Sequence, residues 1–302
     1  MKKIIYQTVV YLLPILLLLL SIELLYQIVP NNYTLKNKNV QKSYADTKVL
    51  IFGNSHTFYG LNPKYFDKPT FNFSNISQSL YFDQLLFDKH IDKFKSLQYI
   101  ILNVEYTSLS QVDNTEEDIW RKYYYKEYMD LEVPIIANFD PKVYFLSSTR
   151  SFSTNLKLIK RFISEGTLVD CDEKGFGINY VKENRQLNID KIALFTVKKH
   201  EDNSLDFSKN ISKIQSIINK CNQKKIKVII VTMPTSKEYS SGVNQLKLKK
   251  IINTCSSFKN VCYLNLFKDS RFTNDDFYDA DHLHNDGAKK CSVIINHFIS
   301  KI

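Results

Sequence analysis

Two polar segments, far apart in the sequence, contain the residue types that a serine nucleophile requires. Ser55 follows the apolar segment 49–52 and the glycine at position 53, whereas Asp279 and His282 lie near the end of the chain. A serine hydroxyl is a weak nucleophile until an imidazole takes its proton and a carboxylate orients that imidazole. Together these three residues indicate a serine hydrolase or an acyl transferase.

The first of these segments predicts a buried strand that ends in a sharp turn. Gly53 permits the turn and would present Ser55 at the carboxyl end of the strand, where active sites of open α/β sheets lie. Gly60 and Pro63 limit any following helix to about one turn, which is enough to direct the Ser55 N–H at an oxyanion. An ordinary Gly-Asn turn has the same residues, so this segment alone does not establish catalysis.

The second segment contains two Asp/His pairs with an i, i+3 spacing that one tight turn can bring into contact. The pairs are Asp279 with His282 and Asp281 with His284. Spacing alone does not choose between them. A solvated loop in which Asn285 or Asp286 caps a C-terminal helix is a third interpretation. Considered with Ser55, the segment favours a catalytic Asp and His.

These residues resemble a known family. Gly53-Asn54-Ser55-His56 is similar to the first block of the SGNH hydrolases, also called the GDSL superfamily, with Asn in place of the usual Asp before the serine. The last block of the family resembles Asp279-x-x-His282 followed by Leu283, Asn285 and Gly287. The resemblance implies that Ser55 is the nucleophile, His282 the base and Asp279 its orienting partner.

The second block of the family is matched less closely by segment 71–79. Ser77 stands where the oxyanion-hole glycine would be, and we expect the N–H groups of Ser55 and Ser77 to line the oxyanion hole. In the third block the family has an asparagine that this chain lacks after segment 99–104. Losing one oxyanion donor typically costs ~100- to 1,000-fold in turnover.

Two further side chains are expected to contact the substrate. After the third predicted strand, Tyr106, Thr107 or a backbone group must substitute for the missing oxyanion donor, or the enzyme is slow. We expect Tyr106 to contact the substrate. His56 adjoins the nucleophile, and we expect it to form a wall of the pocket.

The N-terminal segment is nearly unbroken hydrocarbon from about position 4 to 29, which is long enough to cross a bilayer. A cleaved signal peptide is the alternative, but the residues at 22–26 are too large for a cleavage site. Lys2 and Lys3 favour a cytoplasmic N-terminus. We therefore expect residues 1–29 to be a single-pass anchor in the cell membrane, with the rest of the chain extracytoplasmic.

The remaining chain predicts an α/β domain. Residues 30–47 are polar and indicate a linker, and residues 48–302 alternate strands with helices, which predicts a mostly parallel sheet covered on both faces. The resemblance implies a flavodoxin-like SGNH fold, a three-layer sandwich. Residues 110–205 interrupt the alternation and are expected to form a lid or cap. Strands are expected at 48–52, 70–74, 99–104, 227–232 and 261–266, and helices near 80–96, 207–224, 243–254 and 285–300.

Composition narrows the possible partners. Lys and Arg total 41 against 31 acidic residues, but the excess is scattered and accompanies no base-reading motif, so nucleic acid is not an expected partner. The five cysteines form no C-x-x-C pair, and we expect neither a metal nor a cofactor. Cys255 and Cys262 are the nearest pair for a disulfide.

Two functions fit these observations. The first is a membrane-anchored, extracytoplasmic serine esterase or O-acyltransferase that acts on cell-envelope polysaccharide, or another acylated glycan, through an acyl-serine intermediate. A resemblance in topology to the D-alanine transfer proteins of teichoic-acid modification keeps transfer open. The second is a non-catalytic SGNH-fold binding or assembly partner of a polysaccharide modification or export system, accompanying a membrane acyltransferase.

Overall fold

The computed structural model describes residues 1–112 and 119–302, which form two compact units. Unit 1 comprises Met1–Leu35 and Ile119–Val169. Unit 2 comprises Lys36–Asp118 and Asp170–Ile302. The segment predicted as one insertion, 110–205, is therefore divided between the two units instead of forming a single cap.

Unit 2 is built on a parallel sheet of five strands. They are β1 (Val49–Phe52), β2 (Thr70–Asn72), β3 (Tyr99–Asn103), β4 (Lys227–Thr232) and β5 (Val261–Asn265). Their order across the sheet is β2-β1-β3-β4-β5, and every neighbouring pair is parallel. The predicted α/β class and parallel sheet are thus confirmed, and each predicted strand is present within two residues of its expected ends.

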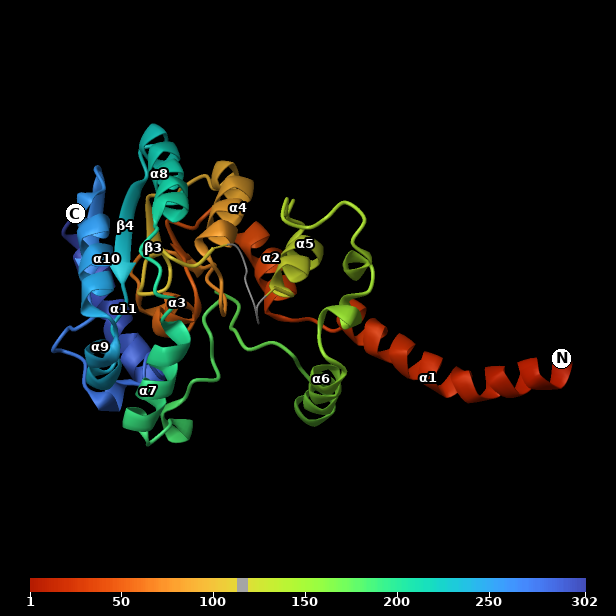
Figure 1. The fold of residues 1–302 in the computed structure, drawn as a ribbon. Coiled ribbons are helices and arrows are strands. Elements are labelled where there is room, and N and C mark those ends of the chain that lie inside the picture. The colour runs from red at the N-terminus through yellow and green to blue at the C-terminus, as the bar shows by residue number, and fades with distance from the viewer. Residues whose placement is uncertain (113–118) are drawn as a thin grey trace. The chain divides into compact units, whose positions relative to one another are not determined.

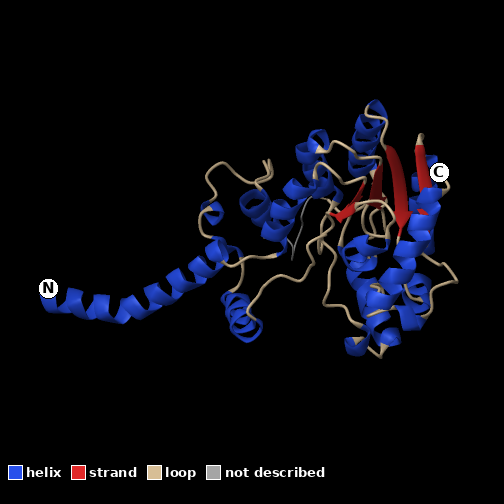
Figure 2. Cartoon of the chain, turned by 180° about the vertical axis from the view of Figure 1, so that it is seen from behind, coloured by secondary structure: helices blue, strands red, loops and turns tan. Residues whose placement is uncertain are grey.

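Helices cover both faces of this sheet, as parallel strands require. The helices of unit 2 include α3 (Ser55–Gly60), α4 (Leu80–His90), α7 (Ile189–His200), α8 (Ser208–Gln223), α9 (Lys237–Gly242), α10 (Gln245–Ser257) and α11 (Asn285–Ser300). Figure 1 shows α4 and α8 on one side of the strands and α10 and α11 on the other. Figure 2 shows the strands enclosed between these helices, a three-layer arrangement.

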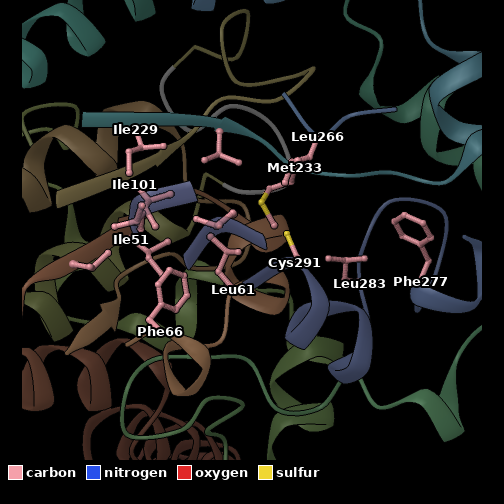
Figure 3. Close-up of a cluster of buried hydrophobic side chains, with 14 residues drawn as sticks. Ile51, Leu61, Phe66, Ile101, Ile229, Met233, Leu266, Phe277, Leu283 and Cys291 are labelled. Carbon is pink, nitrogen blue, oxygen red and sulfur yellow. The ribbon is translucent and has the colours of Figure 1, made fainter. Parts of the chain in front are cut away.

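Alternating side chains of the strands pack against these two helical layers. Ile51, Ile101 and Ile229 lie side by side in register on three neighbouring strands. They join Cys291 of α11 in a buried cluster (Figure 3). On the opposite face, Phe52 packs against Phe87 of α4, with ring centroids 6.3 Å apart. Burial on both faces explains why the strands are apolar along their whole length.

The segment 30–47 is a helix, α2 (Asn32–Ser43), and the linker predicted there is wrong. Tyr33, Lys36 and Val40 are buried at helical spacing, although few of their neighbours are apolar. The Lys36 ammonium donates to the carbonyls of Asn72 and Ser74, and burial lowers its pKa to about 8. Lysine counts as a charged residue in a sequence pattern, so the burial of its aliphatic stem could not be predicted from the sequence.

Unit 1 contains α1 (Lys2–Ile28), α5 (Arg121–Met129) and α6 (Phe152–Glu165). Among the described residues, α1 alone is long and apolar enough to cross a membrane, with a mean hydropathy of 2.4. Most of α1 is exposed, but Ile22, Leu25 and Tyr26 near its end are buried within unit 1. The Tyr26 hydroxyl donates to Asn155 Oδ1 at 2.7 Å.

Short 3-10 helices complete the described structure. They are Pro63–Tyr65, Ile91–Lys93, Pro141–Val143, Leu146–Thr149, Lys182–Asn184 and Asn274–Asp276.

Candidate active site

Ser55 is the first residue of α3, directly after the turn that leaves β1. Gly53 makes this turn with φ 136°, a conformation that residues with a side chain rarely adopt. A Cβ atom at position 53 would lie 2.5 Å from Asn103 Cβ, so the backbone can come this close only with glycine. Asn54 caps α3 by accepting from the His56 N–H at 3.0 Å. The turn therefore holds Ser55 at the carboxyl end of the sheet.

The structure brings together the three predicted catalytic side chains. Ser55 Oγ lies 2.8 Å from His282 Nε2. His282 Nδ1 lies 3.0 and 3.1 Å from the two carboxylate oxygens of Asp279. Asp279 also accepts from the backbone N–H of His282 at 2.8 Å, which fixes the carboxylate against its own turn. This is the geometry in which an imidazole can take the serine proton.

The alternative pair, Asp281 with His284, is not formed. His284 Nδ1 accepts from the N–H groups of Asp286 and Gly287 and so caps α11. Its other ring nitrogen, Nε2, lies 2.5 Å from the carbonyl of Asp275. The capping residue is therefore His284, which lies one position before Asn285 and two before Asp286, the two caps that were expected, and both of its ring nitrogens are occupied.

The N–H groups of Ser55 and Ser77 were expected to line an oxyanion hole. No hydrogen bond to the Ser55 or Ser77 N–H occurs within the described part of the chain. Ser77 has φ 53°, the left-handed conformation that glycine adopts more easily. Ser77 thus keeps the backbone conformation of a glycine while carrying a side chain. Asn103, at the end of β3, is committed elsewhere because its amide donates to Asn54 Oδ1 at 3.0 Å.

A second carboxylate, that of Asp281, lies beside the His282 imidazole. Asp281 Oδ1 is 3.4 Å from His282 Nδ1, and its other oxygen is 3.2 Å from His56 Nε2. Burial lowers the pKa of His282, but Asp279 and Asp281 outweigh burial and hold that pKa well above its usual value. The pKa of Asp281 is well below its usual value because its two histidine neighbours outweigh burial. The sequence pattern suggested Asp281 only as a partner of His284.

His56 is a buried cation beneath the triad, and it does not form the pocket wall that was predicted. It is only 5% exposed, and its Nδ1 forms an ion pair with Glu105 Oε2 at 2.8 Å. Burial lowers the pKa of His56, but Glu105 and Asp281 raise it to about 9 overall. Glu105 also accepts from the Asn54 amide, which joins the charge pair to the serine turn. His56 is therefore placed to act through Asp281 and not on a substrate.

The buried network continues to α7 and α9. His200 Nδ1 is 2.8 Å from the Tyr239 hydroxyl and 3.8 Å from Asp281 Oδ2. Burial lowers the pKa of His200. Asp281 thus lies near three imidazoles. The pKa values of His56 and His282 are raised, whereas the pKa of His200 is lowered.

Three tyrosines stack beside the catalytic histidine. The Tyr59 and Tyr180 rings are 3.7 Å apart and nearly parallel, and Tyr180 and Tyr278 are 3.9 Å apart. His282 meets the Tyr180 ring at 87°, with centroids 5.6 Å apart. Tyr180 and Tyr278 remain partly exposed. Tyr59 and Tyr278 each lie close to a predicted motif, but Tyr180 does not, and no sequence pattern predicted its place beside His282.

Tyr106 is not available as the substrate contact that was predicted. Its side chain is buried, its hydroxyl donates to Glu201, and the hydroxyl oxygen accepts from the Asn244 N–H at 3.1 Å. Lys247 lies over its ring, 4.8 Å from the centroid. Tyr106 therefore fastens β3 to the α9–α10 region.

One side-chain group within the described residues has the composition of a metal site. His56, Asp281 and His282 offer ligand atoms within 4.8 Å of one another. Each of these atoms also has a protein partner, and binding a cation through His282 Nδ1 would displace Asp279 from it. The group fits a network of hydrogen bonds and ion pairs better than a metal site.

No family model and no curated protein matches this chain. Several solved structures are similar to it, and two of them are described here. One, from Streptococcus pneumonia and provisionally described as a platelet activating factor, is 10% identical with a TM-score of 0.39 and covers 87% of this chain and 92% of its own. The other, a GDSL-like lipase from Bacteroides thetaiotaomicron, is 11% identical with a TM-score of 0.39 and covers 88% and 95%. Both are too distant to assign an activity.

Proposed function

We propose that this protein is a serine esterase or O-acyltransferase of the SGNH type. The observation that supports this most directly is the continuous chain from Ser55 Oγ to His282 at 2.8 Å and from His282 to Asp279 at 3.0 Å. Such a chain requires three side chains from two distant segments to be placed together. A purely structural role seldom requires this arrangement of side chains, whereas nucleophilic acyl transfer does.

The chemistry follows from these contacts. Ser55 Oγ attacks the carbonyl carbon of an ester while its proton passes to His282 Nε2, and the N–H groups of Ser55 and Ser77 receive the oxyanion. The tetrahedral intermediate expels the alcohol, which takes the proton from His282 and leaves an acyl-serine. Water or an acceptor hydroxyl then attacks the acyl carbon while its proton passes to His282. The second tetrahedral intermediate releases Ser55 Oγ, which takes this proton from His282, and the acid or the new ester leaves.

Among the described residues, the two side chains closest in sequence to the expected third donor are bound elsewhere. Asn103 is bound to Asn54, and Tyr106 to Glu201 and Asn244. An oxyanion hole with one donor fewer is expected to turn over ~100- to 1,000-fold more slowly. The same oxyanion hole serves water and an acceptor hydroxyl, so a missing donor slows both reactions, and the choice between hydrolysis and transfer depends on how the acceptor is bound.

A glycan acceptor suits the aromatic surface beside the triad. Tyr180 lies in the middle of the stack, Tyr59 at one end is buried, and Tyr278 at the other end is partly exposed. The flat face of an exposed aromatic ring packs well against a sugar ring. We take an acylated cell-envelope polysaccharide as the substrate class, with a membrane acyltransferase as a possible donor partner. This assignment extends the esterase chemistry and is tested separately from it.

Retention of α1 as a membrane anchor is supported by its role in unit 1. Ile22 and Tyr26 are buried there, and the Glu23 carboxylate accepts from the N–H groups of Leu146 and Ser147 at 3.1 and 3.0 Å. Cleavage after the apolar segment would remove these contacts from the folded unit. The proposed location is therefore the cell membrane, with the rest of the chain extracytoplasmic.

The alternative function, a non-catalytic binding partner, is less well supported. A site that had lost catalysis would no longer need the Ser55, His282 and Asp279 contacts, yet all are formed. Ser77 also retains a glycine-like backbone with an unpaired N–H in the described chain.

The test is hydrolysis of p-nitrophenyl acetate by the full chain in lipid nanodiscs, followed by mass spectrometry of the peptide that contains Ser55. We expect a burst of p-nitrophenol with an acetyl group retained on Ser55. Ser55→Ala should abolish the burst and the adduct, and His282→Ala should lower the acylation rate by about 10⁴-fold or more.

Two matched controls separate these effects from loss of fold. Ser256 and His297 are exposed on α10 and α11, and their alanine variants should retain the wild-type burst. Failure of the wild-type chain to acylate Ser55 would favour the binding function. Acylation followed by faster release with oligosaccharide acceptors than with water would support transfer.

A further inference from the structure

Helix α6 exposes an apolar stripe that unit 1 does not cover. Phe152, Leu156 and Ile163 share one face of the helix and are 50%, 43% and 79% exposed. Ile159 completes the stripe and is half-buried. A surface helix of a globular unit normally turns such a face inward, so this stripe requires a partner outside the unit.

The other face of α6 is basic. Its basic residues lie away from the apolar stripe, on the remaining sides of the helix: Lys157, Lys160 and Arg161. The only acidic residue of the helix is Glu165, which pairs with Arg161 at 2.9 Å. A helix with an apolar stripe and a lysine- and arginine-rich face is typical of helices that lie in the interface of anionic membranes.

A groove connects α6 to the apolar part of α1. It has a volume of about 500 Å³ and lies between Leu16, Leu19 and Leu20 of α1 and Phe152 at the start of α6. Phe145 and Arg150 line it from the connecting segment. Arg150 also lies over the Trp120 ring, 3.8 Å from its centroid, so the guanidinium is held at the groove. The cavity is lined mainly by hydrocarbon and contains two charged groups: the Arg150 guanidinium, and the Glu23 carboxylate, whose oxygens accept from the N–H groups of Leu146 and Ser147.

The position of Glu23 in α1 indicates how deep in the membrane the groove would lie. Its carboxylate accepts from the N–H groups of Leu146 and Ser147, so the connecting segment meets α1 at the first charged residue after the apolar part of the helix. A charged group at the end of an apolar span lies at the membrane interface. Leu19 and Leu20 lie about one turn closer to the hydrocarbon, and Phe152 shares the groove with them. The start of α6 thus lies near the boundary between headgroups and acyl chains.

We infer that α6 is an interfacial helix that lies in the headgroup region of the membrane crossed by α1, and that the groove between them holds an acyl chain of an anionic phospholipid. The stripe Phe152, Leu156, Ile159 and Ile163 contacts the acyl chains, while Lys157, Lys160 and Arg150 face phosphate groups. Continuity with the apolar part of α1 and charge complementarity select a lipid as the occupant. The inference rests on the proposed retention of α1 as an anchor.

The test places a fluorescent label at single introduced cysteines of the full chain in nanodiscs. The discs contain phosphatidylglycerol and phosphatidylcholine, with acyl chains either brominated or not, because bromine quenches a label only on contact. The sites are Leu12→Cys in α1, Ile163→Cys in the stripe, Ser148→Cys in the groove and Ser164→Cys on the polar face. The native cysteines all lie in unit 2, and a chain without an introduced cysteine corrects for their labelling.

We expect brominated lipid to quench the labels at positions 12, 163 and 148 severalfold more than the label at 164. Ser148 and Ser164 are both exposed serines, so the contrast between them does not reflect the polarity of the replaced residue. Quenching at 12 alone would overturn the inference and leave the anchor in place. Equal quenching at 163 and 164 would also overturn it, because α6 would then have no oriented face. No quenching at 12 would overturn the anchor and the inference together.

Discussion

Asp281 connects the catalytic histidine to the buried charges below it. It lies between His282 and His56. Both Asp279 and Asp281 lie close enough to His282 to make its imidazole more basic, but they do so in different ways. Asp279 has both oxygens near His282 Nδ1 and also accepts backbone N–H groups, so it orients the ring. Asp281 is more distant, and its effect on His282 is mainly electrostatic.

Asp281→Asn should therefore move the pH profile without abolishing catalysis. A carboxylate this close raises an imidazole pKa by about one to three units, and its removal should move the acid limb of kcat/KM to lower pH by a similar amount. The sign follows because His282 must be neutral to take the serine proton. Stopped-flow rates of acylation across pH measure this shift.

Asp279→Asn is the matched comparison, since both variants replace a carboxylate with an amide. Here we expect a loss of about 10⁴-fold in acylation rate at every pH, because the ring is no longer oriented. Equal losses in the two variants, or an acid limb that stays in place in Asp281→Asn, would contradict the division of roles.

His56 should make the stability of unit 2 depend on pH. Its pKa is about 9 when folded and near 6.5 when exposed, so the protonated form favours folding. This contribution is complete below pH 6.5 and is lost as the pH rises through 9. The loss amounts to about 3 kcal/mol in the free energy of unfolding.

Pulse proteolysis of the full chain in urea, from pH 6 to pH 9.5, measures this free energy. His56→Gln should be less stable than the wild type at pH 6, and its stability should decline less over the same range. Asp83 complicates the wild-type curve because burial raises its pKa to about 7. The difference between wild type and variant isolates His56, and parallel curves would refute its role.

At the scale of elements, the site is made by segments that follow the carboxyl ends of β1 and β3 and by the turn that precedes α11. These positions were predicted because apolar segments indicate the strands, and glycine and proline indicate where a strand or a short helix ends. The catalytic Asp and His were found by their spacing. Their register was settled by packing, since only the folded structure shows that His284 is the cap of α11.

His284→Ala should destabilise α11 by about 1 kcal/mol through loss of this cap. His284→Asn should recover part of the loss, because a short amide can also accept from the first N–H groups of a helix. Urea titration monitored by pulse proteolysis provides the measurement. His297→Ala, near the other end of the same helix, serves as the control and should leave the midpoint unchanged; a midpoint equally unchanged in His284→Ala would exclude the cap.

At the scale of the whole molecule, the chain forms two compact units, each assembled from separate stretches of sequence. The structure contains five free cysteines: Cys171, Cys221, Cys255, Cys262 and Cys291. The disulfide considered between Cys255 and Cys262 is not formed. Burial raises the pKa of Cys255 to about 12, and it raises the pKa of Cys171 to about 11, so these thiols react slowly in the folded protein.

All five thiols should accordingly be alkylated by iodoacetamide once the chain is unfolded, without any reductant. Intact-mass measurement should show five additions, and pretreatment with a reductant should leave that number unchanged. Three additions without reductant and five with it would reveal a disulfide that the structure lacks.

The sequence by itself determined the parallel α/β sheet, the apolar N-terminal helix and three residues that meet in the site, because these depend on local periodicity, spacing and turn chemistry. Tertiary structure alone decided what surrounds those residues. His56 and Asp281 became a buried charge pair, Tyr180 came to lie beside His282, and segment 30–47 folded into α2. Such outcomes depend on which distant groups share a low-dielectric interior, and a one-dimensional pattern does not contain that information.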